Sequence, residues 1–122
     1  MADFSGEITA DVWAPTTSYT SGRGGHKVEY IAVHHEAVGS SPYSIAAMWS
    51  ANGNVSAHYS VDNEGAIAQH VYESDTAYAV GRWEENQRSI SIEHANDHAN
   101  PWTVSETTQE SGAHLVAALL IK

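Results

Sequence analysis

Short apolar runs separated by turn signals predict a chain that alternates between strands and helices. Residues 28–34 contain Val, Tyr, Ile and Val in a short run that is typical of a buried strand. Residues 55–61 and 66–72 form two further runs, and the sequence DNEG between them predicts a hairpin turn. Residues 89–93 read SISIE, and this alternation of polar and apolar positions predicts a strand with one buried face.

Two segments have the spacing of amphipathic helices. One helix is predicted over residues 43–51, after the start signal Ser41-Pro42 and before the turn sequence NGN. Its apolar side holds Ile45, Met48 and Trp49. A second helix is predicted from about Thr103, because Thr103 and Glu106 match a capping box. Its apolar stripe consists of Leu115, Val116, Leu119 and Leu120.

The remaining segments show neither of these periods. Residues 1–27 are rich in Pro, Ser, Thr and Gly, which predicts an N-terminal arm or long loop with a short strand near residues 7–13. Residues 75–88 are predicted to form a further loop. No linker and no internal repeat divides the chain, so residues 28–122 are expected to form one α/β domain.

Composition narrows the classes of partner. The formal net charge of −10, from 15 acidic and 5 basic residues, argues against a nucleic acid or an anionic membrane surface, because phosphates attract Lys and Arg. The absence of cysteine excludes disulfides and thiolate metal ligands. The N-terminal sequence MADFSGEITA has no basic and no apolar region of a secretory signal, and no apolar run is long enough to span a bilayer.

Histidine and glutamate at strand ends are the candidate chemical groups. His34 and His35 are adjacent on a predicted strand, so their side chains point to opposite faces and only one can face a given site. His58 lies in a strand that enters the hairpin, and Glu93 ends an otherwise apolar strand. Burying a carboxylate is costly unless it is paired or functional. The competing interpretation is that these histidines are hydrogen-bonded core residues with no chemical role.

The order of these motifs resembles a known family. The strand IAVHHEA, a helix, the segment SAHYSVDNEGAIAQHV, the segment NQRSISIE and a capped helix follow one another as in the zinc-dependent, type 2 N-acetylmuramoyl-L-alanine amidases. This family is related to phage T7 lysozyme and the peptidoglycan recognition proteins. The resemblance covers residues 28–122 and implies a mixed central β-sheet flanked by helices, with Zn²⁺ in a groove. It also implies cleavage of the amide between N-acetylmuramic acid and L-alanine in bacterial peptidoglycan.

The resemblance implies a role for each matching residue. His34 matches the first zinc ligand, and Glu93 matches the catalytic acidic residue that takes a proton from the attacking water and passes it to the leaving amine. His35 is expected to lie off the metal, either behind the ligand or lining the groove that binds substrate, and His58 to be structural or to line that groove and contact the substrate. Aromatic candidates for binding the glycan and stem peptide are Tyr78, Trp83 and Trp102. The residues Asn86, Arg88 and Ser89 are expected to stabilise the loop before the Glu93 strand.

The chain departs from the family pattern in two places. The family's second ligand, a His, and its third, which is Cys, Asp or His, follow the last predicted helix, so the resemblance implies ligands beyond Lys122 and a catalytic domain truncated at its C-terminus. The family's AWHAG-type segment reads AYAVG here, with Ala79 at the position of an expected His. Three explanations stay open: a fragment or interrupted gene of a full amidase, completion by another chain, or a degenerate module that binds wall fragments without cutting them.

Further expectations follow from these alternatives. An incomplete sheet edge and an uncovered apolar helix stripe promote association, so the chain is expected to self-associate. The enzyme hypothesis predicts a phage endolysin or bacterial autolysin that acts on the cell wall outside the cell, and an endolysin would leave the cell through a holin. A separate possibility is a metal site on the loop that contains Glu93, His94, Asp97 and His98.

Overall fold

The computed structural model describes residues 2–3, 9–35, 41–96, 101 and 103–120. Within these ranges the chain forms nine strands and three helices. The strands are β1 (Ala2–Asp3), β2 (Thr9–Ala10), β3 (Val12–Trp13), β4 (Tyr19–Thr20), β5 (Tyr30–His35), β6 (Tyr59–Val61), β7 (Ile67–Gln69), β8 (Thr76–Ala77) and β9 (Ser89–His94). The helices are α1 (Pro42–Asn52), α2 (Trp83–Arg88) and α3 (Glu106–Leu120).

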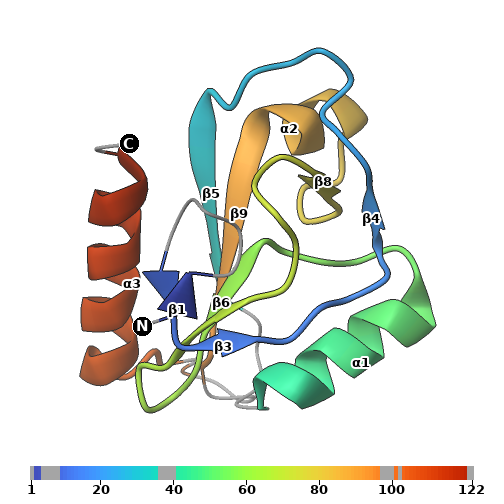
Figure 1. The fold of residues 1–122 in the computed structure, drawn as a ribbon. Coiled ribbons are helices and arrows are strands. Elements are labelled where there is room, and N and C mark those ends of the chain that lie inside the picture. The colour runs from blue at the N-terminus through green and yellow to red at the C-terminus, as the bar shows by residue number, and fades with distance from the viewer. Residues whose placement is uncertain (1, 4–8, 36–40, 97–100, 102, 121–122) are drawn as a thin grey trace.

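A mixed five-stranded sheet forms the centre, in the order β3-β7-β6-β9-β5. The neighbours β5 and β9, β9 and β6, and β7 and β3 are parallel, whereas β6 and β7 form the antiparallel hairpin that the sequence predicts. Two small two-stranded sheets, β1-β2 and β4-β8, lie outside it. The predicted α/β class with a mixed central sheet is therefore confirmed (Figure 1).

Helices lie on both sides of this sheet, with α3 on one side and α1 on the other (Figure 1). The alternation SISIE explains this arrangement, because it turns Ile90 and Ile92 toward α3 and the intervening polar residues to the opposite face. The main apolar cluster contains Ala10, Tyr59, Val61, Ile67, Ile90, Ile92, Leu115 and Leu119. A smaller cluster beside α1 contains Ile45, Trp49 and Ala57.

Helix α1 begins where the sequence predicts. The hydroxyl of Ser41 accepts a hydrogen bond from the backbone N–H of Ser44, at 3.2 Å, and Pro42 occupies the first turn. The helix ends at Gly53, which has a left-handed φ of 81°. The placement of Met48 on the apolar side was wrong: Met48 is exposed, because the buried stripe runs through Pro42, Ile45, Ala46 and Trp49.

The start of α3 differs from the predicted capping box. The cap is Ser105, whose hydroxyl accepts a hydrogen bond from the N–H of Thr108 at 3.1 Å. Thr103 lies too far before the first helical residue, Glu106, to reach that amide, so the predicted box was wrong. Leu115 and Leu119 are buried as predicted, Val116 is half-buried and Leu120 is exposed, so the covered stripe is narrower than predicted.

The N-terminal segment and the predicted loop both contain regular structure. The segment over residues 9–27 contributes β3, which pairs with β7 of the central sheet, and β4, which pairs with β8. The prediction of a loop over residues 75–88 was wrong, because this stretch forms β8 and α2. At 15 residues, α3 is the longest described helix, and none of the described helices combines the length and hydropathy of a membrane span.

Candidate functional site

The structure places the two principal candidates side by side. His34 on β5 and Glu93 on β9 are register partners near the carboxyl ends of two parallel strands, so their side chains share one face of the sheet. The Nδ1 atom of His34 lies 4.0 Å from Oε1 of Glu93. Both side chains are partly buried, with 31 % and 17 % of their surface exposed. His34 and Glu93, which the sequence linked only through the order of motifs, are therefore neighbours in the structure.

Burial sets the charge of this pair. Burial raises the pKa of the Glu93 carboxyl to about 7. Burial also lowers the pKa of His34 below its usual value, and the nearby His35 and His94 contribute in the same direction. At neutral pH His34 is thus a neutral imidazole rather than the cation of an ion pair. Its Nε2 atom is buried and has no hydrogen-bond partner among the described residues, which leaves a nitrogen available to a ligand.

His58, predicted to be structural or to contact substrate, lies in the interior. Its Nδ1 accepts a hydrogen bond from the N–H of Ser91 at 3.1 Å, so Nε2 carries the proton and donates to the carbonyl of Asp75 at 2.8 Å. Burial lowers the pKa of His58 to about 3, partly opposed by the hydrogen bond to Asp75. The side chain is fully buried, so no substrate reaches it in this conformation and the geometry supports the structural role.

Arg23 is a buried residue that sequence reasoning does not single out. Its Nε donates to the carbonyl of Glu73 at 2.7 Å, and its Nη1 donates to the carbonyls of Gln87 and Ser89, each at 2.9 Å. These bonds tie the N-terminal segment to the start of β9. The only local signal is an arginine between glycines in the stretch GRGG, which is too common in surface loops to indicate burial.

Tyr78 and Trp83 lie together, as expected for an aromatic binding surface. Their ring centroids are 6.3 Å apart, and they line a pocket of about 520 Å³ that α2 and the residues after α1 also border. Asn86 accepts a hydrogen bond from the N–H of Val80 at 2.8 Å, which agrees with the predicted loop-stabilising role. His34 and Glu93 do not line this pocket, so substrate binding by Tyr78 and Trp83 stays a prediction.

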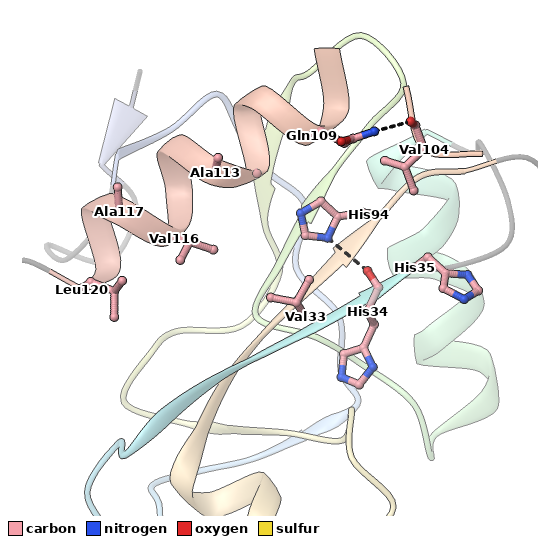
Figure 2. Close-up of a pocket in the computed structure, with 11 residues that line it drawn as sticks. Val33, His34, His35, His94, Val104, Gln109, Ala113, Val116, Ala117 and Leu120 are labelled. Atoms are coloured by element: carbon pink, nitrogen blue, oxygen red, sulfur yellow. Dashed lines mark hydrogen bonds between the residues drawn. The ribbon is translucent and has the colours of Figure 1, made fainter. Parts of the chain in front are cut away.

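A second, apolar groove of about 800 Å³ lies between β5 and α3 (Figure 2). Val33, Val116 and Leu120 border it, together with His34, His35 and His94. The imidazole Nδ1 of His94 lies 3.1 Å from the carbonyl oxygen of His34 and so fixes the strand end, while His35 is exposed at the groove. His35 therefore lines this groove, and its role in a substrate-binding groove stays a prediction.

The described residues do not complete a metal centre. A catalytic zinc normally has three protein ligands. No group of three or more His, Cys, Asp or Glu side chains able to hold a metal occurs among the residues that the structure describes. Within the described part of the chain, Nε2 of His34 is the single side-chain nitrogen whose burial and missing partner fit a ligand. Of the alternative loop site, Asp97 and His98 lie outside the described residues, as does the aromatic candidate Trp102.

Comparison with known proteins gives one family and a consistent fold. The model of the N-acetylmuramoyl-L-alanine amidase family matches residues 24–122. A selenomethionine derivative of AmpD superposes with a TM-score of 0.75 at 18 % identity, over 99 % of this chain and 79 % of that one. No curated protein sequence gives a significant match.

Two further solved structures share the fold. The Staphylococcus aureus hydrolase AmiA, solved in complex with its ligand, has a TM-score of 0.69 at 22 % identity over 93 % of this chain. A mutant endolysin from Bacillus subtilis has a TM-score of 0.53 at 23 % identity over 74 % of this chain. The chain spans 57 % and 64 % of these two proteins, respectively.

The family match covers most of the chain, including the strands β5 and β9, which carry His34 and Glu93. The mixed sheet with helices on both sides agrees with the folds of AmpD and AmiA. From sequence match and architecture together, the chain belongs to the type 2 N-acetylmuramoyl-L-alanine amidase family.

Proposed function

We propose that this chain is the catalytic part of a peptidoglycan hydrolase that cleaves the amide between N-acetylmuramic acid and L-alanine. The observation that carries the proposal is the placement of a half-buried carboxylate, Glu93, beside His34 at one end of the sheet, in a chain of the amidase family. Amide hydrolysis needs a group that takes a proton from water and a group that stabilises the developing charge.

Glu93 is suited to the proton transfer. Burial brings its pKa to about 7, so the carboxyl can accept the proton of the attacking water and later donate it to the leaving amine of L-alanine. His34 stays neutral beside it, because burial lowers its pKa. The two side chains are near enough to act on one substrate group, since their closest nitrogen and oxygen are 4.0 Å apart.

His34 is also the proposed zinc ligand. Its buried, unpartnered Nε2 fits a metal–nitrogen bond, and zinc at such a site supplies a water of lowered pKa. A complete zinc site would need further ligands from outside the described residues. We therefore propose zinc dependence as a property to be measured, together with action on the cell wall as an endolysin or autolysin.

A second candidate function is binding of wall fragments without cleavage. Two observations favour it: the described residues contain no three-ligand metal group, and Tyr78 and Trp83 line a pocket of their own. A pure binding module, however, gains nothing from a costly half-buried carboxylate such as Glu93. The two functions therefore differ in what the removal of Glu93 does.

The decisive experiment incubates the chain with purified peptidoglycan, with and without added Zn²⁺, and measures the release of free L-alanine amino groups. Glu93→Gln is nearly isosteric and is expected to lower the rate by about 100-fold or more, the usual size of a lost general base. Co-sedimentation with peptidoglycan should be unchanged. If the wild-type chain co-sediments but releases no amino groups in either condition, the binding module is the better description.

A further inference from the structure

A serine completes the row of side chains that contains His34 and Glu93. The parallel strands β5, β9 and β6 place His34, Glu93 and Ser60 in register, so the three side chains lie in one row on the same face. Adjacent strands are roughly 4.8 Å apart, which makes Ser60 the direct neighbour of Glu93 on the interior side. Ser60 is buried, with 2 % of its surface exposed.

The hydroxyl of Ser60 donates its hydrogen bond to the imidazole of His70. Nδ1 of His70 lies 2.7 Å from the carbonyl oxygen of Ala14, and Nε2 of His70 lies 2.7 Å from Oγ of Ser60. A carbonyl oxygen only accepts, so Nδ1 must carry the imidazole proton. Burial lowers the pKa of His70 to about 4, which keeps the ring neutral and Nε2 an acceptor. Ser60 therefore donates its O–H to His70.

The pair has the geometry of a serine nucleophile and its base, but it cannot act as one. Ser60 on β6 and His70, which follows β7, are both buried, with 2 % and 1 % of their surfaces exposed. No substrate carbonyl therefore reaches the hydroxyl. The ring of Trp49 packs against His70 in an edge-to-face arrangement, with the two ring centroids 5.0 Å apart. The pair can therefore act only through a neighbouring side chain.

The neighbour in question is Glu93. Because its proton is donated to His70, the Ser60 hydroxyl has only lone pairs left for its register neighbour Glu93, and a lone pair and an ionised carboxylate do not form a hydrogen bond. Among the described residues none donates a hydrogen bond to that carboxylate, and its oxygen lies toward His34 instead. A serine hydroxyl that was free to rotate would donate to the carboxylate and draw it toward the interior.

We propose that Ser60 and His70 are positioning residues, which keep the Glu93 carboxylate directed at His34 by holding the Ser60 hydroxyl proton away from it. The functional value of this arrangement rests on the proposed role of Glu93 as the proton-transfer group. The hydrogen-bond arrangement itself does not depend on that role, so the two can be tested separately.

The test uses two variants: the first removes the acceptor of the Ser60 hydroxyl proton, and the second removes the hydroxyl as well. In His70→Asn, the amide nitrogen can still donate to the Ala14 carbonyl, but the acceptor at Nε2 is lost, so Ser60 is free to donate to Glu93. In the double variant His70→Asn/Ser60→Ala, no hydroxyl is present to do so. His58→Asn and His58→Asn/Ser60→Ala are the matched controls, because His58 is equally buried on the same face and is bonded to Ser91 and Asp75 instead.

Two readouts follow the carboxylate. In His70→Asn, the pKa of Glu93 measured by carboxyl ¹³C NMR should fall by about one unit or more, because a hydrogen bond to the ionised form favours it. The kcat for peptidoglycan hydrolysis should fall about tenfold with KM unchanged, the size of one charged hydrogen bond. In the double variant, the acid dissociation constant of Glu93 and the kcat should both return to within about threefold of their wild-type values. In the control pair, adding Ser60→Ala should not restore either quantity to His58→Asn.

A purely structural role predicts additive losses in the double variant, and that result would overturn the proposal. A shift of the NMR pKa without any hydrolysis by the wild-type chain would support the positioning pair and refute the proposed function. One measurement needs no substitution: the imidazole ¹⁵N shifts of His70 should show a protonated Nδ1 and an unprotonated Nε2. The opposite tautomer would overturn the proposal even if His70→Asn failed to fold.

Discussion

At the scale of single residues, burial decides the charge of each chemical group. His34, His58 and His70 have lowered pKa values and Glu93 has a raised one, all with burial as the main cause. The neutral forms of the first three can accept or donate hydrogen bonds in fixed tautomers, as His58 and His70 do. One physical effect therefore produces both the neutral buried histidines and a carboxyl that titrates near neutral pH.

The buried histidines predict acid sensitivity. His58 and His70 have pKa values of about 3 and 4 in the folded chain, against about 6.5 when unfolded. The unfolded chain therefore binds more protons below pH 6.5, and stability falls as the pH drops from about 6.5 toward 4. Between pH 7 and 4.5 each histidine is expected to lower the free energy of unfolding by up to about 2–3 kcal/mol. Urea unfolding at the two pH values measures this change.

Glu93 acts in the opposite direction over the same interval. Its raised pKa means that the folded chain binds the proton more tightly, so protonation of Glu93 stabilises the fold as the pH falls from about 7. In Glu93→Gln this compensation is absent, and the loss of stability between pH 7 and 4.5 should be larger than in wild type. Equal losses of stability in the two chains would mean that the pKa of the Glu93 carboxyl is not raised in the folded chain.

At the scale of elements, the packing of α3 depends on a glycine. A Cβ atom added at Gly112 would overlap Nε2 of His94, and His94 is held at its other nitrogen by the carbonyl of His34. Alanine favours a helix over glycine by up to about 1 kcal/mol, but the overlap should outweigh this gain. We expect Gly112→Ala to lower the free energy of unfolding by about 1–3 kcal/mol in chemical denaturation.

Gly81→Ala is the control for this substitution, because no atom lies within 4 Å of a Cβ built there and its φ is not in the left-handed region. Its effect should stay within about 0.5 kcal/mol, as for other surface changes. A Gly112→Ala variant that is more stable than wild type would show that His94 moves aside at little cost. It would also show that the contact between His94 and the carbonyl of His34 does not fix the end of β5.

Elements with a strong local signal were the ones that the sequence could predict. Residues 28–34 and 89–93 are short apolar or alternating runs, and β5 and β9 lie there within two residues of the predicted bounds. Helix α2 has six residues and no apolar period, so its position depends on contacts that only the fold supplies. The short strand predicted near residues 7–13 corresponds to β2 and β3, whereas the two-residue strand β4 was not predicted, because its partner β8 lies more than 50 residues away.

The candidate site divides in the same way. His34 and Glu93 were found from motif order through a family resemblance, and the register of β5 and β9 brings them together. Ser60 and His70 lie in an unremarkable hairpin sequence, and their meeting depends on the diagonal placement that the β6–β7 register produces. Arg23 was missed because three of its partners are backbone carbonyls, which leave no trace in the sequence, and because its contact with the ring of His58 depends on the fold.

At the scale of the whole molecule, one side of the described sheet is open. Strand β5 is the last in the sheet order, and Val33 on it and Leu120 on α3 are 61 % and 70 % exposed beside the apolar groove. An edge strand next to an apolar surface favours pairing with another chain. We expect the mass measured by light scattering to rise above 13.1 kDa with concentration.

Val33→Lys places a charge on this edge and should restore a monomer at concentrations where the wild type associates. Tyr43→Lys is the control, because Tyr43 is also exposed, at 65 %, but lies on α1 on the other side of the sheet (Figure 1). A wild-type chain that stays monomeric at about millimolar concentration would contradict the expected association. If both lysine variants reduce self-association equally, the reduction is due to the added charge and not to the edge of β5.

The edge position of β5 also affects how firmly the candidate site is held. His34 belongs to a strand with one neighbour in the described sheet, whereas Glu93 belongs to β9, which has a neighbour on each side and packs under α3. Amide hydrogen exchange should therefore be faster along β5 than along β9, since an edge strand can open without unfolding the core. Each such opening separates the imidazole from the carboxylate, so the site can be lost and regained while the rest of the fold stays intact.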